Sequence, residues 1–415
     1  MNGVKAAKKV IERWPRKFRS ELLFDQFVLP MTRICHVFDG CTGWEQRVAV
    51  SQLLDRLPAD QFSQEVITLD PAARNVLASL PRPASVLHGA LPWNFLTAPV
   101  LRRFGERNDV EVFHAWGPRA ASAACAASAD HGPRGRSTGA RRVTVLSLFD
   151  PRLGTRHIKL LRALAGRSAF AIACASGIVR RRLIEGGFPA ESTVMIRPGV
   201  DFARINEFRR GGLREELGLS RADFAVIIPE PVSPEVGAFD AALAVVLVNH
   251  IYGGFRVMLP GRSPERDRVE RVVVGLPSPN PLAGSAFAGP FERMLCAADA
   301  LVIAPRGDHS TTAIAWAMAA GVPVIGTAVH SVAELIANKV NGLLFKQVPG
   351  KGMAVSIAKL LQDRASQTKA KEAARGQAYE VFGLRRYVED HVRLYDNVRE
   401  GRAAADGITD PALVG

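Results

Sequence analysis

Residues Ala300–Gly326 read ALVIAPRGDHSTTAIAWAMAAGVPVIG, and this stretch decides the fold class. Its first part, Ala300–Ala304, is a short apolar run typical of a buried parallel strand. Three hydroxyl residues before Ala313 suit a helix start, and the small apolar residues that follow suit a helix packed tightly on a sheet. Gly321 ends that helix, and Val322–Ile325 opens the next strand. A strand–loop–helix–strand unit places its loop where open α/β sheets bind ligands.

Composition limits the classes of function. The chain has 415 residues, which allows two domains, and a net charge of +14. This charge suits an acidic partner such as a nucleotide, a phospholipid or an anionic polysaccharide, and an inert basic surface explains it equally well. Nucleic acid is disfavoured, because only 7% of residues are aromatic and no zinc-finger pattern is present. The five cysteines form no CxxC pair, so we expect buried thiols, no metal site and a cytoplasmic protein.

The first thirty residues have a different character. Lysines and arginines alternate there with Val10, Ile11, Trp14 and Phe18, which predicts a basic amphipathic extension over residues 1–30. A secretory signal is not expected, because its continuous apolar core is missing. The segment either packs on its own protein or lies peripherally on an anionic membrane at the inner face. No run of eighteen apolar residues occurs, so no transmembrane helix is expected.

The stretch AWAMAAGVPVIGTAVHSVAELI, followed by NGLLF, resembles the nucleotide-binding helix and loop of family 4 glycosyltransferases. These proteins have the GT-B fold, in which two Rossmann-like domains face each other across a cleft. The beginning of the chain agrees, because Arg33–Phe38 predicts a strand, a glycine turn follows, and a helical pattern starts at Trp44. Gly199, Val200 and Asp201 match the family's Gly-Val-Asp phrase before the interdomain linker. The resemblance thus implies an α/β protein of the GT-B fold.

The same resemblance divides the chain into five segments. After the extension 1–30 we expect an acceptor-side domain over residues 31–204 and a donor-side domain over residues 205–380. A closing helix over residues 381–402 returns to the first domain, and residues 403–415 are expected to form a disordered tail.

Candidate site residues follow from the family pattern and from nearby charges. The resemblance implies catalytic roles for His114, Asp150 and Asp308, and donor-binding roles for Gly43, Trp316 and Glu334. Three further residues could supply the donor site with positive charge: Arg262, Arg306 and His309. Each has a structural alternative: His114 as an ordinary strand-end histidine, Gly43 as a tight turn, and the arginines as common loop charges.

Four positions depart from the family pattern. Phe149 replaces a histidine, Glu230 an arginine, Val236 a lysine, and Trp316 the glutamate that holds the ribose. In retaining transfer from a nucleotide sugar, the leaving diphosphate gathers negative charge, and cations must stabilise it. A carboxylate at position 230 would repel the diphosphate, and an indole cannot accept the ribose hydroxyls.

Two hypotheses therefore remain open. In the first, the protein is a retaining, hexosyltransferase-type enzyme that uses a nucleotide sugar, a glycan or lipid acceptor and no other cofactor. Its cations would then be rearranged around Arg262 and Arg306. In the second, it is a catalytically inactive GT-B pseudoenzyme that binds a partner or a glycan.

Overall fold

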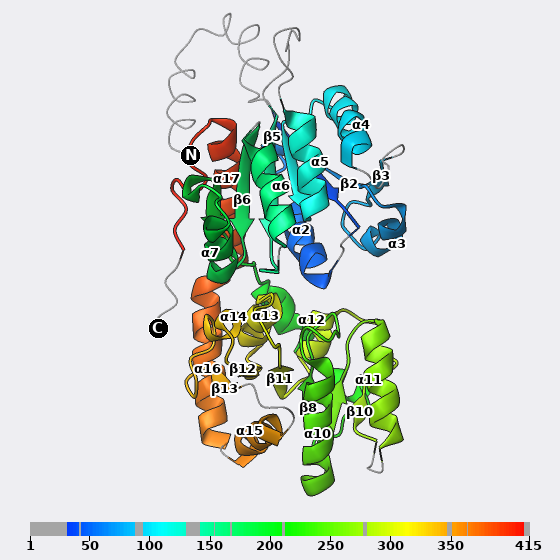
Figure 1. Ribbon diagram of the computed structural model, residues 1–415. Helices are drawn as coiled ribbons and strands as arrows, with labels where there is room; N and C mark the ends of the chain where they lie inside the picture. The colour runs from blue at the N-terminus through cyan, green and yellow to red at the C-terminus, as the bar shows by residue number, and fades with distance from the viewer. Residues whose placement is uncertain are drawn as a thin grey trace, which may run out of the picture.

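The computed structural model describes residues 31–40, 43–87, 94–129, 142–152, 154–166, 168–209, 212–276, 280–346, 351–362 and 364–410. The expected extension over residues 1–30 lies outside these ranges. Two parallel sheets, of seven and six strands, lie one above the other with helices packed on them (Figure 1). This is the α/β arrangement of two Rossmann-like units that the sequence predicts.

The first sheet has the strand order β3-β2-β1-β4-β5-β6-β7, and all its neighbouring strands are parallel. Its strands are β1 (Thr32–Phe38), β2 (Phe62–Thr68), β3 (Ser85–Val86), β4 (Val112–Trp116), β5 (Val143–Leu148), β6 (Ala169–Cys174) and β7 (Thr193–Met195). The helices that follow these strands are α2 (Trp44–Arg56), α3 (Arg74–Leu77), α4 (Asn94–Arg107), α5 (Pro118–Ser128), α6 (Thr155–Ala165) and α7 (Gly177–Glu185). Separate apolar cores fill its two faces, one under α2 and the other under α4 to α7.

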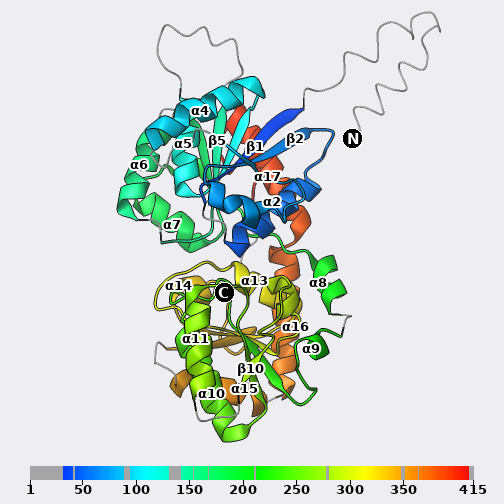
Figure 2. The same cartoon turned by 90° about the vertical axis from the view of Figure 1, so that its right-hand side faces the viewer.

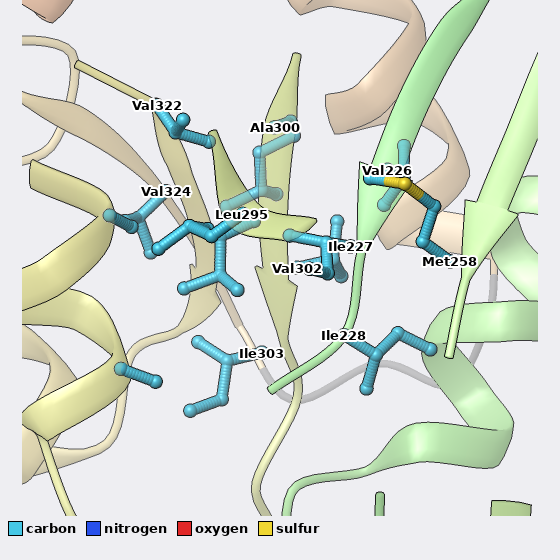
Figure 3. Close-up of a cluster of buried hydrophobic side chains, with 14 of the residues drawn as sticks. Val226, Ile227, Ile228, Met258, Leu295, Ala300, Val302, Ile303, Val322 and Val324 are labelled. Atoms are coloured by element: carbon cyan, nitrogen blue, oxygen red, sulfur yellow. The ribbon is translucent and has the colours of Figure 1, made fainter. Parts of the chain in front are cut away.

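The second sheet has the order β10-β9-β8-β11-β12-β13 and is also parallel. Its strands are β8 (Phe224–Ile227), β9 (Phe255–Met258), β10 (Leu282–Ala283), β11 (Ala300–Ile303), β12 (Val324–Thr327) and β13 (Gly342–Phe345). Its helices are α10 (Ala238–Tyr252), α11 (Pro264–Gly275), α12 (Phe291–Leu295), α13 (Thr312–Ala320), α14 (His330–Ala333), α15 (Lys351–Gln362) and α16 (Arg364–Val381). Two short helices, α8 (Phe202–Phe208) and α9 (Leu213–Glu216), connect the two sheets. Figure 3 shows the apolar side chains of β8, β9 and β11 that meet in this core.

Helix α13 is deeply buried in the second half and is the helix that the opening stretch predicts. None of its residues is more than 4% exposed, because its small side chains let it lie close to the sheet. Gly321 caps its end with a φ of 66°, a left-handed conformation that favours glycine.

The last helix, α17 (Leu384–Arg399), leaves the second sheet and packs on the first. Tyr387, Leu394 and Tyr395 lie in the same apolar core as Ile34 and Phe38 of β1. Figures 1 and 2 show the crossing, with orange α16 beside the lower sheet and red α17 beside the upper one. Helix α17 therefore joins the two halves.

The structure differs from the expected disordered tail over residues 403–410. Ala404 and Ile408 are buried, and the Asp410 carboxylate accepts a hydrogen bond from Arg197 Nε at 2.8 Å. Asn397 donates to the carbonyl oxygens of Ala404 and Asp406, which fixes the turn. Residues 411–415 lie outside the described ranges. No helix in the described part is both long and apolar enough to cross a membrane.

Candidate functional site

A cavity of about 490 Å³ lies between the two halves, which we call the interdomain cavity. Helix α2 lines it from the first half, and the segment that leads into α12 lines it from the second. Three aromatic side chains form part of its wall: Trp44, Phe291 and Trp316. The Trp44 ring meets Phe291 edge-on at 4.7 Å and Trp316 edge-on at 6.0 Å between centroids. The cavity thus has an aromatic side to which both halves contribute.

Trp316 brings an unsatisfied donor to this wall. The residue is 1% exposed, and its Nε1 has no hydrogen-bond partner among the described residues. The neighbouring Trp44 differs, because its Nε1 donates to Glu292 Oε2 at 2.8 Å. A buried N–H without an acceptor is unfavourable unless a ligand or water supplies one. Trp316 therefore lines the cavity and carries a buried donor that the described residues leave unsatisfied.

Arginines and carboxylates line the rest of the interdomain cavity in pairs. The pairs are Arg47–Glu230 at 3.3 Å, Arg56–Asp201 at 3.4 Å and Arg204–Glu292 at 3.0 Å. Burial raises the pKa of Glu230, Arg47 acts against this shift, and Glu292 adds to it. Gly261 leaves room for the carboxylate, because a Cβ atom there would lie 3.1 Å from Glu230 Cδ. Where the family has an arginine, this chain thus has the carboxylate of Glu230, which pairs with Arg47 of the other half.

A second polar group of residues lies where α2 begins. Arg152 donates to both carboxylate oxygens of Asp150, with Nε to Oδ1 at 2.9 Å, and its Nη2 lies 3.3 Å from His309 Nε2. Glu45 is hydrogen-bonded to Ser310, and burial, with the charge of Asp150, raises its pKa to about 7. Although burial alone would raise it, the pKa of Asp150 is lowered by its bonds to Arg152. We call these five residues the polar cluster.

The polar cluster borders a lateral hollow of about 450 Å³, which Arg152, Glu235, Arg306 and His309 help to line. Burial lowers the pKa of His309, which keeps the ring neutral and able to accept from Arg152. Arg306 is largely exposed and lies 3.7 Å from Asp240. The structure thus brings Asp150 and His309 together, with Arg306 at the rim.

The two acidic candidates from the resemblance, Asp308 and Glu334, hold the halves together. Asp308 Oδ2 accepts from Arg182 Nη2 of α7 at 3.0 Å, and its Oδ1 accepts from the backbone N–H of Ser331. Glu334 Oε1 accepts from the backbone N–H of Gly177 at 2.8 Å and from Arg197 Nη1 at 2.8 Å. Glu334 is therefore committed to contacts between the halves, whereas Asp308 contacts both halves and also lines the lateral hollow.

His114 lies apart from both hollows. It is fully buried on β4, where Nδ1 lies 2.8 Å from Tyr395 Oη and Nε2 lies 2.8 Å from Ser147 Oγ. Its ring stacks on Trp116 at 4.3 Å, and burial holds its pKa well below the usual range. This placement favours the structural alternative.

The remaining candidates make few contacts. Gly43 precedes α2, and no atom of the described residues lies within 4 Å of a Cβ atom built on it, so none of them requires glycine there by a close approach. Arg262 is exposed and belongs to the lining of neither hollow. Of the replaced family positions, Phe149 stacks on Trp116 and Val236 is 1% exposed, so both are core residues.

Two residues that sequence reasoning missed, Arg47 and Arg152, supply cations to the cavity and the hollow. Both belong to the first half, whereas the family pattern places its cations in the second. A weak signal exists for each: Arg47 lies two positions after the family turn at Glu45, and Arg152 follows Asp150 closely. Among the described residues, no cluster of three or more His, Cys, Asp or Glu side chains could hold a metal ion.

Two facing Rossmann-like sheets, joined by a terminal helix that crosses back, define the class of GT-B glycosyltransferase folds. Sequence comparison agrees with this class. The family described as "Glycosyltransferase Family 4" matches residues 46–204, and "Glycosyl transferases group 1" matches residues 290–377. No curated protein matches at a significant level. The chain is a family 4 glycosyltransferase-like protein of the GT-B fold, as the sequence predicts.

Solved structures with the same fold cover most of the chain. Anabaena HepE in complex with UDP has a TM-score of 0.70 and 19% identity, over 87% of this chain and 98% of HepE. Its complex with UDP-glucose has a TM-score of 0.71 at 18% identity, with the same coverage. A glycosyltransferase from Rickettsia africae has a TM-score of 0.69 and 14% identity, over 89% and 99% of the two chains.

Proposed function

We propose that this protein is a retaining glycosyltransferase that binds a nucleotide sugar in the interdomain cavity. The observation that carries the proposal is that Trp316 lines the cavity and that its buried Nε1–H has no acceptor among the described residues. A ribose hydroxyl or a phosphate oxygen of the donor would supply that acceptor. The aromatic wall formed by Trp44, Phe291 and Trp316 suits the flat face of a base. The UDP and UDP-glucose complexes of HepE support a donor of this class.

The polar cluster is the proposed place of the acceptor. Retention requires the acceptor oxygen to enter on the face from which the diphosphate leaves, so the acceptor must reach the donor between the two halves. Glu45, with a pKa of about 7, can accept a proton from an acceptor hydroxyl near neutral pH. Asp150 stays ionised through its bonds to Arg152 and can orient that hydroxyl. We assign residues 31–204 to the acceptor and residues 205–380 to the donor.

The cellular setting belongs to the same proposal. We place the enzyme in the cytoplasm, with residues 1–30 in peripheral contact with an anionic membrane. Lysines and arginines in this segment fit such a surface. A lipid acceptor would be presented there, and a glycan acceptor would not require the contact.

One observation favours the second candidate function, a pseudoenzyme that binds a glycan. The three arginines of the interdomain cavity are each paired with a carboxylate, so the cavity has no excess positive charge for a diphosphate. Carboxylates, guanidinium groups and tryptophans together also suit the hydroxyls and the apolar faces of an uncharged sugar.

Calorimetry with UDP, GDP and ADP, followed by their sugar derivatives, tests the proposal. We expect one nucleoside diphosphate to bind, and Trp316→Phe, which removes the N–H donor together with part of the indole ring, to weaken its affinity by about three- to tenfold. Trp116→Phe is the matched control, because this indole bonds to His36 in the core and lines neither hollow. Its nucleotide affinity should be unchanged.

The reaction itself is followed with the sugar donor that binds. Proton NMR should show a product whose anomeric configuration equals that of the donor. Binding of a glycan, with no binding of any of the three nucleotides, would replace the proposal with the pseudoenzyme.

A further inference from the structure

Arg47 and Glu230 form an unusual pair for a cavity that takes a nucleoside diphosphate. Arg47 lies on α2 of the first half and Glu230 follows β8 of the second, and their side chains are 27% and 16% exposed. Both line the interdomain cavity, together with Trp316. A diphosphate that enters this cavity meets the guanidinium and the carboxylate side by side. It is attracted by the first and repelled by the second.

We propose that Arg47 binds the diphosphate of the donor by exchanging Glu230 for it, and that Glu230 takes up a proton when it is released. This inference rests on the proposed function, because it needs a diphosphate in the interdomain cavity. A guanidinium suits this exchange, since its planar set of donors fits a carboxylate and a phosphate equally well. The cation that the donor requires is thereby supplied by the first half of the chain.

The surroundings of Glu230 explain the proton. Once Arg47 turns to the phosphate, the carboxylate is left largely buried, next to the bound anion and near Glu292 of α12. Arg204 of α8 does not compensate it, because its Nη2 is paired with Glu292 Oε1 at 3.0 Å. A buried carboxylate without a partner is far more stable when protonated. The pKa of Glu230 is already raised by burial while Arg47 is in place, and loss of the arginine raises it further.

Two consequences distinguish this exchange from an ordinary arginine contact. Binding of the nucleoside diphosphate takes up a proton, so its affinity increases as the pH is lowered through the range in which Glu230 titrates in the complex. Glu230→Gln, which removes the competing anion and keeps the shape of the side chain, binds the diphosphate more tightly than the unchanged protein. An arginine that was only a structural partner of Glu230 would give neither effect.

Calorimetry on the full-length protein tests the exchange, with the nucleoside diphosphate from the panel above and its nucleoside as probes. Titrations in buffers of different ionisation enthalpy measure the protons taken up. Arg47→Ala should lower the affinity for the diphosphate by about ten- to hundredfold and leave the affinity for the nucleoside unchanged. Glu230→Gln should raise the affinity for the diphosphate by about tenfold and abolish the proton uptake on binding.

Arg33→Ala is the matched control, because Arg33 pairs with Asp109 at the same 3.3 Å distance on the surface of the first half. Its affinity and proton uptake should equal those of the unchanged protein. A double variant, Arg47→Glu with Glu230→Arg, returns the cation to the second half and should regain most of the affinity lost in Arg47→Ala.

The outcomes separate this inference from the proposed function. If the diphosphate binds and Arg47→Ala leaves both its affinity and the proton uptake unchanged, the proposed exchange of Glu230 for the diphosphate is wrong. The proposal that the interdomain cavity binds the donor is then kept. If neither the unchanged protein nor Glu230→Gln binds any of the three diphosphates, both proposals fall.

Discussion

Glu45 is a single carboxylate whose protonation depends on the contact between the two halves. Its pKa rises from 4.5 to about 7, chiefly through burial, so the folded protein holds the proton at pH values where the unfolded chain has lost it. The unfolding free energy therefore decreases as the pH rises from 4.5 to 7, by up to about 3 kcal/mol. We predict that Glu45→Gln raises the unfolding free energy by about 1–3 kcal/mol at pH 8 and has no such effect at pH 4.

Urea denaturation at both pH values measures this difference. Glu106→Gln, at an exposed position of α4, is the control and should change stability equally little at either pH. A gain for Glu45→Gln that is the same at pH 4 and pH 8 would contradict the assigned cause. A lower transfer rate in the more stable variant would connect Glu45 to the acceptor.

Single residues show most clearly where sequence reasoning ends. Trp316 was identified because it stands where the resembled family has the glutamate that holds the ribose, and it lines the interdomain cavity. Arg47 was missed because its partner Glu230 lies 183 positions away. Arg152 bonds to the nearby Asp150, and its contact with His309, 157 positions away, could not be read from that spacing. Such pairs depend on how two separately formed sheets face each other. No periodicity or spacing within one segment carries that information.

At the scale of elements, the N-terminus of α7 depends on a residue from the other half. Ser176 stands at the N-cap position of this helix, but its side chain makes no capping bond. Glu334 does so instead, through the backbone N–H groups of Gly177 and Ile178, and also pairs with the buried Arg197. We predict that Glu334→Ala lowers the unfolding free energy by about 2–3 kcal/mol, because two amides and a buried guanidinium lose an acceptor.

Thermal and urea unfolding measure this loss, with Ser176→Ala as the control. Because the Ser176 hydroxyl has no partner among the described residues, its removal should change stability by less than about 0.5 kcal/mol. The same variants test the donor-binding role that the family resemblance implies for Glu334. If Glu334→Ala weakens nucleotide binding and leaves stability unchanged, the side chain serves the donor and the capping interpretation is wrong.

Helix boundaries were predictable where the signals are local. Helix α13 was expected over residues 313–320 and occupies Thr312–Ala320. Gly321 ends it in a left-handed conformation, whereas Thr311 at the N-cap makes no side-chain capping bond. The segment after Arg402 was misjudged for the opposite reason. Its polar and small residues are typical of a disordered end, and only the crossing of α17 provides Ala404 and Ile408 with a surface to bury against.

At the scale of the whole molecule, three buried histidines connect α17 to the first sheet. The His114 ring lies 5.3 Å from that of His36 on β1 and 5.6 Å from that of His391 on α17. Burial lowers the pKa of His36 and of His391 from 6.5 to about 4 and holds that of His114 well below its usual range. These rings are therefore neutral in the folded protein throughout the physiological pH range.

This neutrality predicts an acid-sensitive fold. Below pH 6.5 the unfolded chain gains protons that the folded protein cannot take up until about pH 4, so stability is full above 6.5 and decreases as the pH falls. His391→Met should reduce the decrease in unfolding free energy between pH 7 and pH 5 by about 2 kcal/mol, because one titrating ring is removed. His250→Asn, on the exposed side of α10, should leave the decrease unchanged. Urea unfolding at the two pH values measures both variants, and equal slopes for the unchanged protein and His391→Met would show that α17 is not held by a neutral ring. Because α17 is the helix that crosses between the two halves, the loss of stability at acid pH should also loosen its packing on the first sheet. Hydrogen exchange measures this, and the amides of α17 should exchange faster at pH 5 than at pH 7.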